Sequence, residues 1–320
     1  MKQQIGKWLS ILLPILLGLT LVIYTYNKFT PEQLEEIKLQ FKNADYFYIY
    51  ISLLISAIAL WSRGYRWKYT LEHLGYKPKI STNVMAVCIG YFINMSIPRS
   101  GEVSRALLLK KYEDVPFDKA FGTIIAERVV DTFFLFSFIG LAFLLEFDVL
   151  KAFVLDKIPF KKLMLIIGIA TFMMIGVVLI FRYSKIRLIQ TIKVKISGLL
   201  DGVFSIWKME KKWAFLFHSL LIWASYFSMF YITIFALPET SNLSLSTVVI
   251  SFIVGGLAIT LTNSGFGAYP FLMAEILLLY NVPETAGTAF GWLVWTSQTL
   301  MVAILGTLSF LLLPILNKNK

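Results

Sequence analysis

Long apolar blocks separated by short charged stretches constrain this chain more than any other feature of its sequence. Six blocks are 17 to 27 residues long, and about 20 helical residues are needed to cross the roughly 30 Å hydrocarbon core of a bilayer. The six blocks are Trp8–Tyr26, Tyr46–Ser62, Ala120–Leu145, Leu163–Phe181, Trp213–Leu237 and Gly287–Leu313. The 320 residues are 58% hydrophobic and only 15% charged, whereas about a quarter of a soluble domain is charged. We therefore predict one all-α, polytopic membrane domain over residues 1–320.

Two further apolar regions are each interrupted by a polar break. Thr82–Lys111 is broken at Ile97–Gly101, and Leu245–Tyr280 is broken at Asn263–Gly267. The apolar arm after each break has only about 8 to 12 residues, or about 12–18 Å of helix, which is too short to cross. Each region is predicted to be a re-entrant hairpin, because backbone leaves a helix at membrane depth only where it is buried or lines a wet cavity. Eight plain spans are the alternative.

The distribution of lysine and arginine predicts the orientation of the chain. If the N-terminus is cytoplasmic, the inner segments carry 20 basic residues and the outer segments carry seven, as the positive-inside rule requires. Both termini are therefore expected in the cytoplasm, with the chain in a bacterial inner membrane. In this orientation the two hairpins enter from opposite faces, which is typical of an inverted repeat with a binding site where the tips meet. The similarity between the two halves is faint, so the repeat is left open.

The chain offers few groups for metal or thiol chemistry. It has one cysteine, Cys88, and two well-separated histidines, His73 and His218, so neither a disulfide nor a metal cluster of these residues is expected. In a chain this apolar, the net charge of +11 is better matched to the anionic cytoplasmic leaflet than to nucleic acid. We predict no metal, cofactor or nucleic-acid partner, and the oligomeric state is left open.

Two polar stretches are predicted to lie at the membrane surface. Thr30 is followed by Pro31 and Gln33, which is a capping-box helix start with proline in the first turn. Arg182–Lys212 spaces its isoleucines three or four residues apart with lysines between them. That spacing predicts a basic amphipathic helix on the inner leaflet.

Seven ionisable residues lie in or near apolar segments, where an unpaired charge costs about 2.5 kcal/mol or more. They are Arg99, Glu102, Arg105, Glu127, Arg128, Asp131 and Glu275. Three positive and four negative charges are close to balance, so pairing is expected. If a helix begins near the first break, Glu102 shares a face with Arg105. In the same way, Glu127 and Arg128 lie four and three residues before Asp131.

The charged residues have two interpretations that the sequence leaves open. They are either structural ion pairs that fix how helices dock, or a site in which part of the arginine charge is free for an anionic ligand. The planar guanidinium fork matches two phosphate oxygens, and free N–H groups at Gly101 and Glu102 would add an anion site where a helix begins. The second break would add N–H donors and close backbone approach from Asn263, Ser264, Gly265 and Gly267. Glu275 either pairs with an arginine of the first hairpin or is protonated. A lipid phosphate is the predicted ligand.

Three short motifs resemble those of one family. Asn94–Arg105 resembles the N-x-x-x-P-x-x-x-G/E-x-x-R region of the lysylphosphatidylglycerol synthase transmembrane family, also called flippase-like. Glu127–Asp131 resembles its E-R-x-x-D motif, and Ser264–Gly267 with Glu275 resembles its glycine-rich loop. The family usually has a proline and paired glycines in that loop, which this chain lacks. Trp295–Leu300 falls where the family has a tryptophan and polar residues.

The resemblance implies a bundle with re-entrant helices that translocates lipids across the cytoplasmic membrane. The leading hypothesis is therefore a lipid flippase-like transporter for a phospholipid, an aminoacyl-phospholipid or a polyprenyl phosphate. Members of the family exist in which such a module precedes a soluble aminoacyl-transferase domain. Here the sequence ends at Lys320, directly after the last span, so aminoacylation is not expected. A membrane-embedded transferase acting on a lipid-linked substrate and a non-transporting scaffold are the alternatives.

Overall fold

The computed structural model describes residues 2–147 and 208–318, together with the isolated residues Gly168, Phe172, Met173, Gly176, Tyr183 and Gln190. All regular structure in these ranges is helical. Within the described residues, four helices are long and apolar enough to cross a membrane. They are α3 (Tyr46–His73), α6 (Phe117–Leu145), α10 (Lys212–Thr233) with the 3-10 turn that follows it, and α13 (Glu284–Leu316). The predicted class, an all-α polytopic membrane protein, is confirmed.

The N-terminal part of the chain is a bent pair of helices. α1 (Lys2–Lys28) meets α2 (Pro31–Asn43) at 113°, and the pair passes the test for a span when taken together. The predicted capping box is confirmed: the Thr30 hydroxyl accepts from the Gln33 N–H, and the Gln33 side chain accepts from the Thr30 N–H. This reciprocal cap begins α2 directly after the bend. The predicted span Leu163–Phe181 lies outside the described ranges apart from isolated residues, and so does the amphipathic helix predicted over Arg182–Lys212, except for its last five residues, 208–212.

Two pairs of shorter helices form the predicted re-entrant hairpins. α4 (Ile80–Ser96) packs against α5 (Gly101–Glu113), and α11 (Leu245–Leu261) packs against α12 (Ala268–Leu278). The four arms have 11 to 17 residues, so they are about 17 to 26 Å long and each is shorter than the bilayer core of about 30 Å. The chain turns back at each break, and the alternative of eight plain spans does not describe it.

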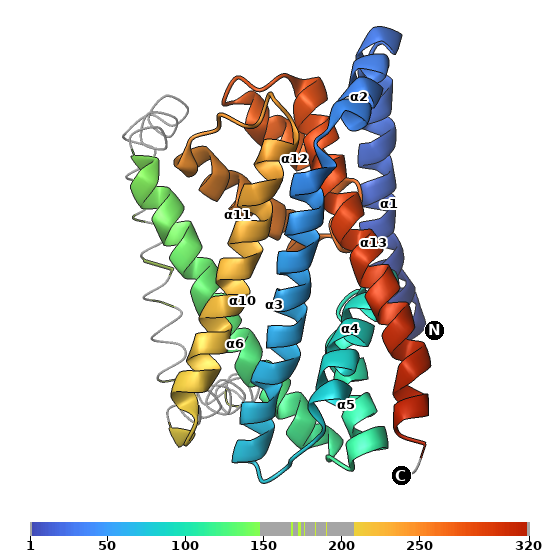
Figure 1. Ribbon diagram of the computed structural model, residues 1–320, viewed down its shortest axis with the longest axis vertical. Coiled ribbons are helices and arrows are strands. Elements are labelled where there is room, and N and C mark those ends of the chain that lie inside the picture. Colours follow the sequence, from blue (N-terminus) through green and yellow to red (C-terminus); the bar gives the residue numbers. More distant parts are fainter. Residues whose placement is uncertain are drawn as a thin grey trace.

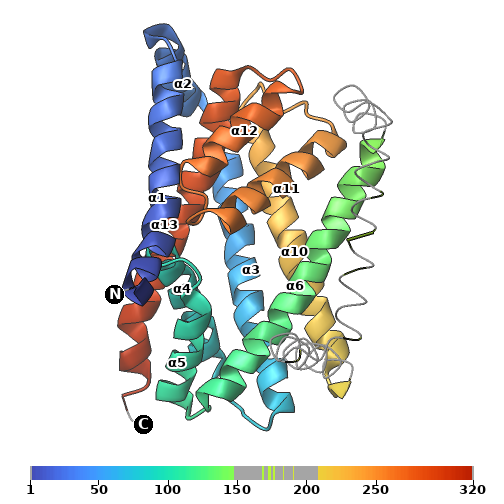
Figure 2. The same ribbon diagram turned by 180° about the vertical axis from the view of Figure 1, so that it is seen from behind.

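The hairpins occupy opposite ends of the bundle, as Figures 1 and 2 show. The α4–α5 hairpin lies in the half where α3 ends and α6 begins. The α11–α12 hairpin lies in the half where α2 lies and α13 begins. We call the first half the basic end, because it carries Lys68, Lys77, Lys79, Lys110 and Lys111, and the other half the α2 end. This arrangement is the one that an inverted repeat requires. The repeat itself and the side on which each end lies stay predictions.

The buried apolar residues form two main clusters, one beside each hairpin. At the basic end, Trp67 and Leu71 of α3 pack with Leu109 of α5 and Ile124 of α6. At the α2 end, the largest cluster joins α10, α12 and α13 and includes Phe290, which is fully buried. Each hairpin is therefore held by its own packed core, and the breaks of the two hairpins face each other between these cores.

Candidate functional site

The middle of α6 carries three charged residues, Glu127, Arg128 and Asp131. Glu127 and Asp131 are four residues apart and share the buried face of the helix, with side chains only 1% and 9% exposed. Arg128 points to a different side, and 40% of its side chain is exposed. The 29 residues of α6 form about 43 Å of helix, long enough to cross a core of about 30 Å. Arg128 lies eleven residues, or about 16 Å, along the helix from its first residue, Phe117.

Asp131 is bound by two arginines of α3, Arg63 and Arg66, which lie beyond the end of the predicted span Tyr46–Ser62. Nη1 of Arg63 and Nη1 of Arg66 each lie 2.8 Å from an oxygen of Asp131. The predicted end of this span at Ser62, which leaves both arginines in the cytoplasmic segment that follows, is wrong. The helix continues to His73, and both arginines are buried. Leu71 and the buried tryptophan before it extend the apolar face past the charges, and that signal in the sequence predicts the longer helix.

The same two arginines are also tied to α10. Nη1 of Arg66 donates to the Ser219 hydroxyl at 3.0 Å, and Nε of Arg63 donates to the Tyr226 hydroxyl at 3.3 Å. The Tyr226 hydroxyl lies 3.1 Å from that of Tyr91 on α4. One carboxylate on α6 thus organises contacts that reach α3, α4 and α10.

The remaining pairs connect α6 to α5. Arg105 Nη2 lies 3.1 Å from Glu127, and Arg128 Nη2 lies 2.9 Å from Glu102. The predicted pairing of Glu102 with Arg105 on the same helix is wrong, because each of them pairs with a residue of α6 instead. The predicted pair of Arg128 with Asp131 is present at 3.7 Å. The guanidinium of Arg105 also lies 4.2 Å from the ring of Trp67, a cation–π contact that favours a desolvated arginine.

These side chains form one assembly, which we call the charge network. Its members are Arg63, Arg66, Glu102, Arg105, Glu127, Arg128 and Asp131. Four guanidinium groups against three carboxylates give it a net charge of +1, the opposite sign to the sum of the seven residues singled out from the sequence. Within the described part of the chain, the Nε groups of Arg66, Arg105 and Arg128 and the Oε1 oxygen of Glu127 form no hydrogen bond, and this oxygen lies 3.7 Å from Nε of Arg66 in an ion pair. The Nε groups of Arg105 and Arg128 are therefore left without an acceptor in a network that has one positive charge in excess.

Arg99 lies outside this network. It occupies the first break with a left-handed backbone, φ 61°, and its side chain is exposed. No ion pair or hydrogen bond joins it to another described residue. The neighbouring Gly101 N–H, which we had expected to be free, donates to the Asn94 side chain at 2.7 Å. The start of α5 therefore has one donor fewer for an anion than predicted.

The tips of the two hairpins touch. The Asn263 side chain donates to the Met95 carbonyl at 3.0 Å, and the Ser264 hydroxyl donates to the Asn94 carbonyl at 3.3 Å. Trp295 of α13 donates from its ring nitrogen to the Ser264 carbonyl at 2.8 Å. The predicted meeting of the two breaks between the ends of the bundle is thus observed, and the polar groups of the second tip bind backbone carbonyls of the first.

Glycines permit the second tip to turn and to approach its neighbours. Gly265 and Gly267 both have positive φ, at 80° and 67°, and Ser264 has φ 54°. A Cβ added to Gly267 would lie 2.2 Å from the Gly18 carbonyl oxygen of α1. Glycine is needed here both for the backbone conformation and for this contact.

Glu275 is not part of the arginine site. It lies on α12, eight residues or about 12 Å along the chain beyond Gly267, toward the α2 end. Its carboxylate lies 3.6 Å from Lys28 at the end of α1, which also pairs with Glu284 at the start of α13. The expected pairing of Glu275 with an arginine of the first hairpin is therefore wrong. In the described residues no group of three or more potential metal ligands is assembled.

The fold and the charge network define a polytopic membrane module in which two opposed re-entrant hairpins meet beside buried arginines. Residues 11–306 match the family model of the lysylphosphatidylglycerol synthase TM region, and the chain belongs to that family. It is 25% identical over 298 residues to a UPF0104 membrane protein of Methanocaldococcus jannaschii, covering 83% of this chain and 82% of the relative. It is 27% identical over 177 residues to a UPF0104 membrane protein of Pyrococcus horikoshii, covering 54% and 49%. No solved structure matches the chain.

Proposed function

We propose that the protein moves a phosphate-bearing lipid across the cytoplasmic membrane. The headgroup passes the charge network while the hydrocarbon chains stay in the bilayer. The observation that carries the proposal is the net charge of +1 in a network of seven charged side chains between apolar helices. Membership in the lysylphosphatidylglycerol synthase TM region family supports a role within the membrane. The candidate lipids are a phospholipid, an aminoacyl-phospholipid and a polyprenyl phosphate.

The excess of one arginine favours a binding role over a purely structural one. A charge at the centre of a bilayer costs about 2.5 kcal/mol or more, and a structural lock needs only as many arginines as carboxylates. An additional guanidinium is stabilised if an anion joins the network during part of the working cycle. A lipid phosphate is the abundant anion that its own chains hold at the membrane, next to the helices that carry the network.

Arg128 is the member best placed to receive that anion. Its guanidinium is shared between Glu102 at 2.9 Å and Asp131 at 3.7 Å, and its side chain is 40% exposed, whereas the other arginines of the network are buried. Its Nε has no acceptor among the described residues. A phosphate that displaces Glu102 would gain two parallel N–H donors from the planar fork. Arg99, exposed at the neighbouring tip, offers a second cation.

In the proposed transport cycle, the contact between the two hairpin tips acts as a gate. Asn263 and Ser264 bind the backbone carbonyls of Met95 and Asn94, so the polar parts of the two halves are closed against one another. A headgroup that crosses between the halves requires these bonds to be exchanged. Alternating access in membrane transporters generally moves one half of the fold against the other around such a central site.

The test is lipid translocation in proteoliposomes, followed with fluorescent phosphatidylglycerol that dithionite bleaches only in the outer leaflet. Arg128→Gln should slow translocation about tenfold or more, because a hydrogen bond to a charged group contributes about 1.5–3 kcal/mol. Arg128→Lys keeps the charge and loses the fork, so it should be intermediate. Lys38→Gln, which removes an exposed cation on α2, is the matched control and should leave the rate unchanged.

Each alternative has a result that would support it. Wild-type rates in a folded Arg128→Gln variant would refute the assignment of the site. Preserved translocation in Glu102→Arg combined with Arg128→Glu, which keeps the pair and reverses its direction, would refute the binding role of Arg128 and leave it a structural one. Failure of the folded wild-type protein to translocate any of the candidate lipids would favour a non-transporting scaffold. Turnover of a labelled lipid-linked donor by the purified protein would favour a transferase.

A further inference from the structure

The first helix, α1, lies alongside α12, the shorter arm of the second hairpin. Three contacts join the two helices, and the residue numbers rise together on both sides. They are Gly18 with Gly267, Tyr24 with Phe271 and Lys28 with Glu275. α1 therefore runs parallel to α12, from the tip of the hairpin toward its far end. Among the described helices, α12 is also the one against which α1 packs most.

The contact at the tip is between two backbones. A Cβ added to Gly18 would lie 2.4 Å from the Phe266 carbonyl oxygen, and a Cβ added to Gly267 would lie 2.2 Å from the Gly18 carbonyl oxygen. Glycine at both positions is what permits this approach. On its other side, the same turn donates from Asn263 and Ser264 to the first hairpin. The second tip is thus held between α1 and the first hairpin.

The far end of α1 is attached through Lys28, its last residue. The ammonium of Lys28 lies 3.6 Å from Glu275 of α12 and also pairs with Glu284, the first residue of α13. Because α13 packs on α4 of the first hairpin as well, this pair ties α1 to an element that both hairpins share. The side chains of Lys28, Glu275 and Glu284 are 37%, 43% and 21% exposed. Ion pairs of this kind are modest and are weakened by salt, unlike the buried pairs of the charge network.

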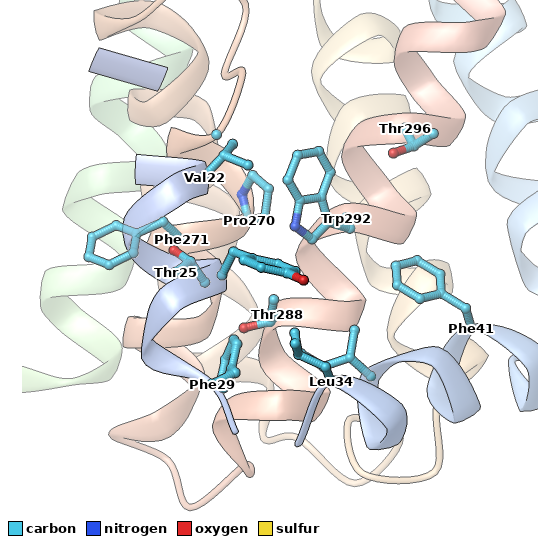
Figure 3. Close-up of a pocket in the computed structure, with 13 residues that line it drawn as sticks. Val22, Thr25, Phe29, Leu34, Phe41, Pro270, Phe271, Thr288, Trp292 and Thr296 are labelled. Atoms are coloured by element: carbon cyan, nitrogen blue, oxygen red, sulfur yellow. The ribbon is translucent and has the colours of Figure 1, made fainter. Parts of the chain in front are cut away.

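Between these two points a groove of about 350 Å³ separates α1 from α13. Figure 3 shows the groove, which is lined by Val22 and Phe29 of α1 and by Trp292 of α13. Side chains that face an open groove lack the dispersion contacts that closely packed helices make. Lys28 is therefore the principal attachment of α1 to α13.

We propose that α1 is a strap that holds the tip of the second hairpin against the first, with Lys28 as its releasable fastening. The tip cannot leave the first hairpin unless α1 moves with it or the contact between Gly18 and Gly267 is broken. When the pairs of Lys28 break, α1 stays attached to the second hairpin alone, and the two can shift together. Release of Lys28 therefore increases the fraction of molecules in which the tips are apart. This opening is measured without any lipid transport, so it is tested independently of the proposed function.

The experiment follows hydrogen exchange of the full chain in lipid nanodiscs by mass spectrometry, at peptides that cover residues 94–101 and 262–269. Amide exchange reports the equilibrium for local opening. Lys28→Met should speed exchange in both tip peptides about fivefold, because two partly exposed ion pairs are lost together. The peptide 124–132 of α6 should keep its rate. Lys38→Met, which breaks an exposed pair within α2, is the matched control and should leave all three rates unchanged.

Salt separates the effect of the ion pairs from an effect of packing. Raising the salt concentration from about 0.1 M to 1 M shortens the screening length from about 10 Å to about 3 Å. The tip peptides of the wild type should then exchange faster and approach the rates of Lys28→Met, whereas the same salt should change Lys28→Met little. A salt effect of equal size in the two proteins would overturn the role of Lys28.

A second variant tests the other end of the strap and keeps the test decisive if Lys28→Met does not fold. Gly18→Ala places a methyl group against the Phe266 carbonyl and should speed exchange in the tip peptides about fivefold or more. Gly140→Ala on α6, with open space around its Cβ, is the matched control and should leave the tip rates unchanged. Wild-type tip rates in folded Gly18→Ala would overturn the proposal. So would an acceleration that is equally large in the peptide 124–132, because it would show a general loss of stability.

Discussion

Replacing Asp131 by asparagine removes the carboxylate on which the charge network depends. Asp131 receives Arg63 and Arg66 at 2.8 Å each, and its side chain is only 9% exposed. The substitution raises the net charge of the network from +1 to +2 and turns an amide NH₂ donor toward groups that only donate. Breaking a buried ion pair by removing one partner costs about 3–5 kcal/mol.

The predicted effect is a large loss of thermal stability. For soluble domains of 150 to 250 residues, 1 kcal/mol corresponds to about 2–4 °C in Tm, so Asp131→Asn should unfold roughly 6–20 °C earlier. The apparent midpoint is measured in detergent by tryptophan fluorescence at one fixed scan rate, since membrane proteins commonly unfold irreversibly. Glu35→Gln is the control, because Glu35 and Lys38 form an exposed pair on α2 and such pairs contribute little.

A double variant separates charge from packing. Arg63→Met combined with Asp131→Asn returns the network to a net charge of +1 and should recover part of the lost stability, as coupled residues do. A midpoint for Asp131→Asn within about 2 °C of the Glu35→Gln control, a shift expected for about 1 kcal/mol or less, would refute the reasoning. The network would then be held by packing, and its charges would have little effect on the fold.

Two further predictions concern the second tip and the basic end. Gly267→Ala should lower the free energy of unfolding by about 2–5 kcal/mol, because it combines a disfavoured φ with a Cβ only 2.2 Å from the Gly18 carbonyl oxygen. Gly75→Ala, with φ 87° and open space around its Cβ, has only the backbone part of that loss. Equal thermal unfolding midpoints for the two variants would contradict the clash. The hydrogen bond from Lys211 to Glu72 at 3.0 Å raises the pKa of Lys211 above its ordinary value. The pair contributes stability below about pH 10.4, the ordinary pKa of lysine, and this contribution is lost as the pH rises through the higher pKa of the folded state. Thermal unfolding midpoints of wild type and Lys211→Met, measured as a function of pH, should therefore converge in strong base.

The fold could be predicted where local chemistry determines it. The apolar blocks, the breaks at Ile97–Gly101 and Asn263–Gly267 and the cap at Thr30 are each a property of a short stretch of chain, and each is found in the structure. The opposed entry of the hairpins followed from counting basic residues. With Arg63 and Arg66 moved into the membrane, the inner segments keep eighteen basic residues against seven outside, so that prediction does not depend on the misplaced pair.

The candidate site could be predicted only in part, because its partners come from different helices. The E-R-x-x-D motif identified Glu127, Arg128 and Asp131, but the sequence carries no sign of which α3 or α5 residues meet them. Ending α3 at its first arginine removed two members of the network. Glu275 was assigned to the wrong cation because its partner Lys28 is nearly 250 residues away in the chain. Such pairings depend on the packing of α1 against α12, which no local pattern encodes.

The bonds that join the two hairpin tips are few compared with those inside either half. Two side-chain hydrogen bonds, at 3.0 and 3.3 Å, link Asn263 and Ser264 to the opposite hairpin, and ordinary hydrogen bonds contribute about 0.5–1.5 kcal/mol each. The charge network ties α3, α5, α6 and α10 with several ion pairs buried in low dielectric. The contact between the two tips is therefore the one that thermal fluctuations open most readily, while α3, α10 and α13, which run past both hairpins (Figure 1), keep the body of the bundle together.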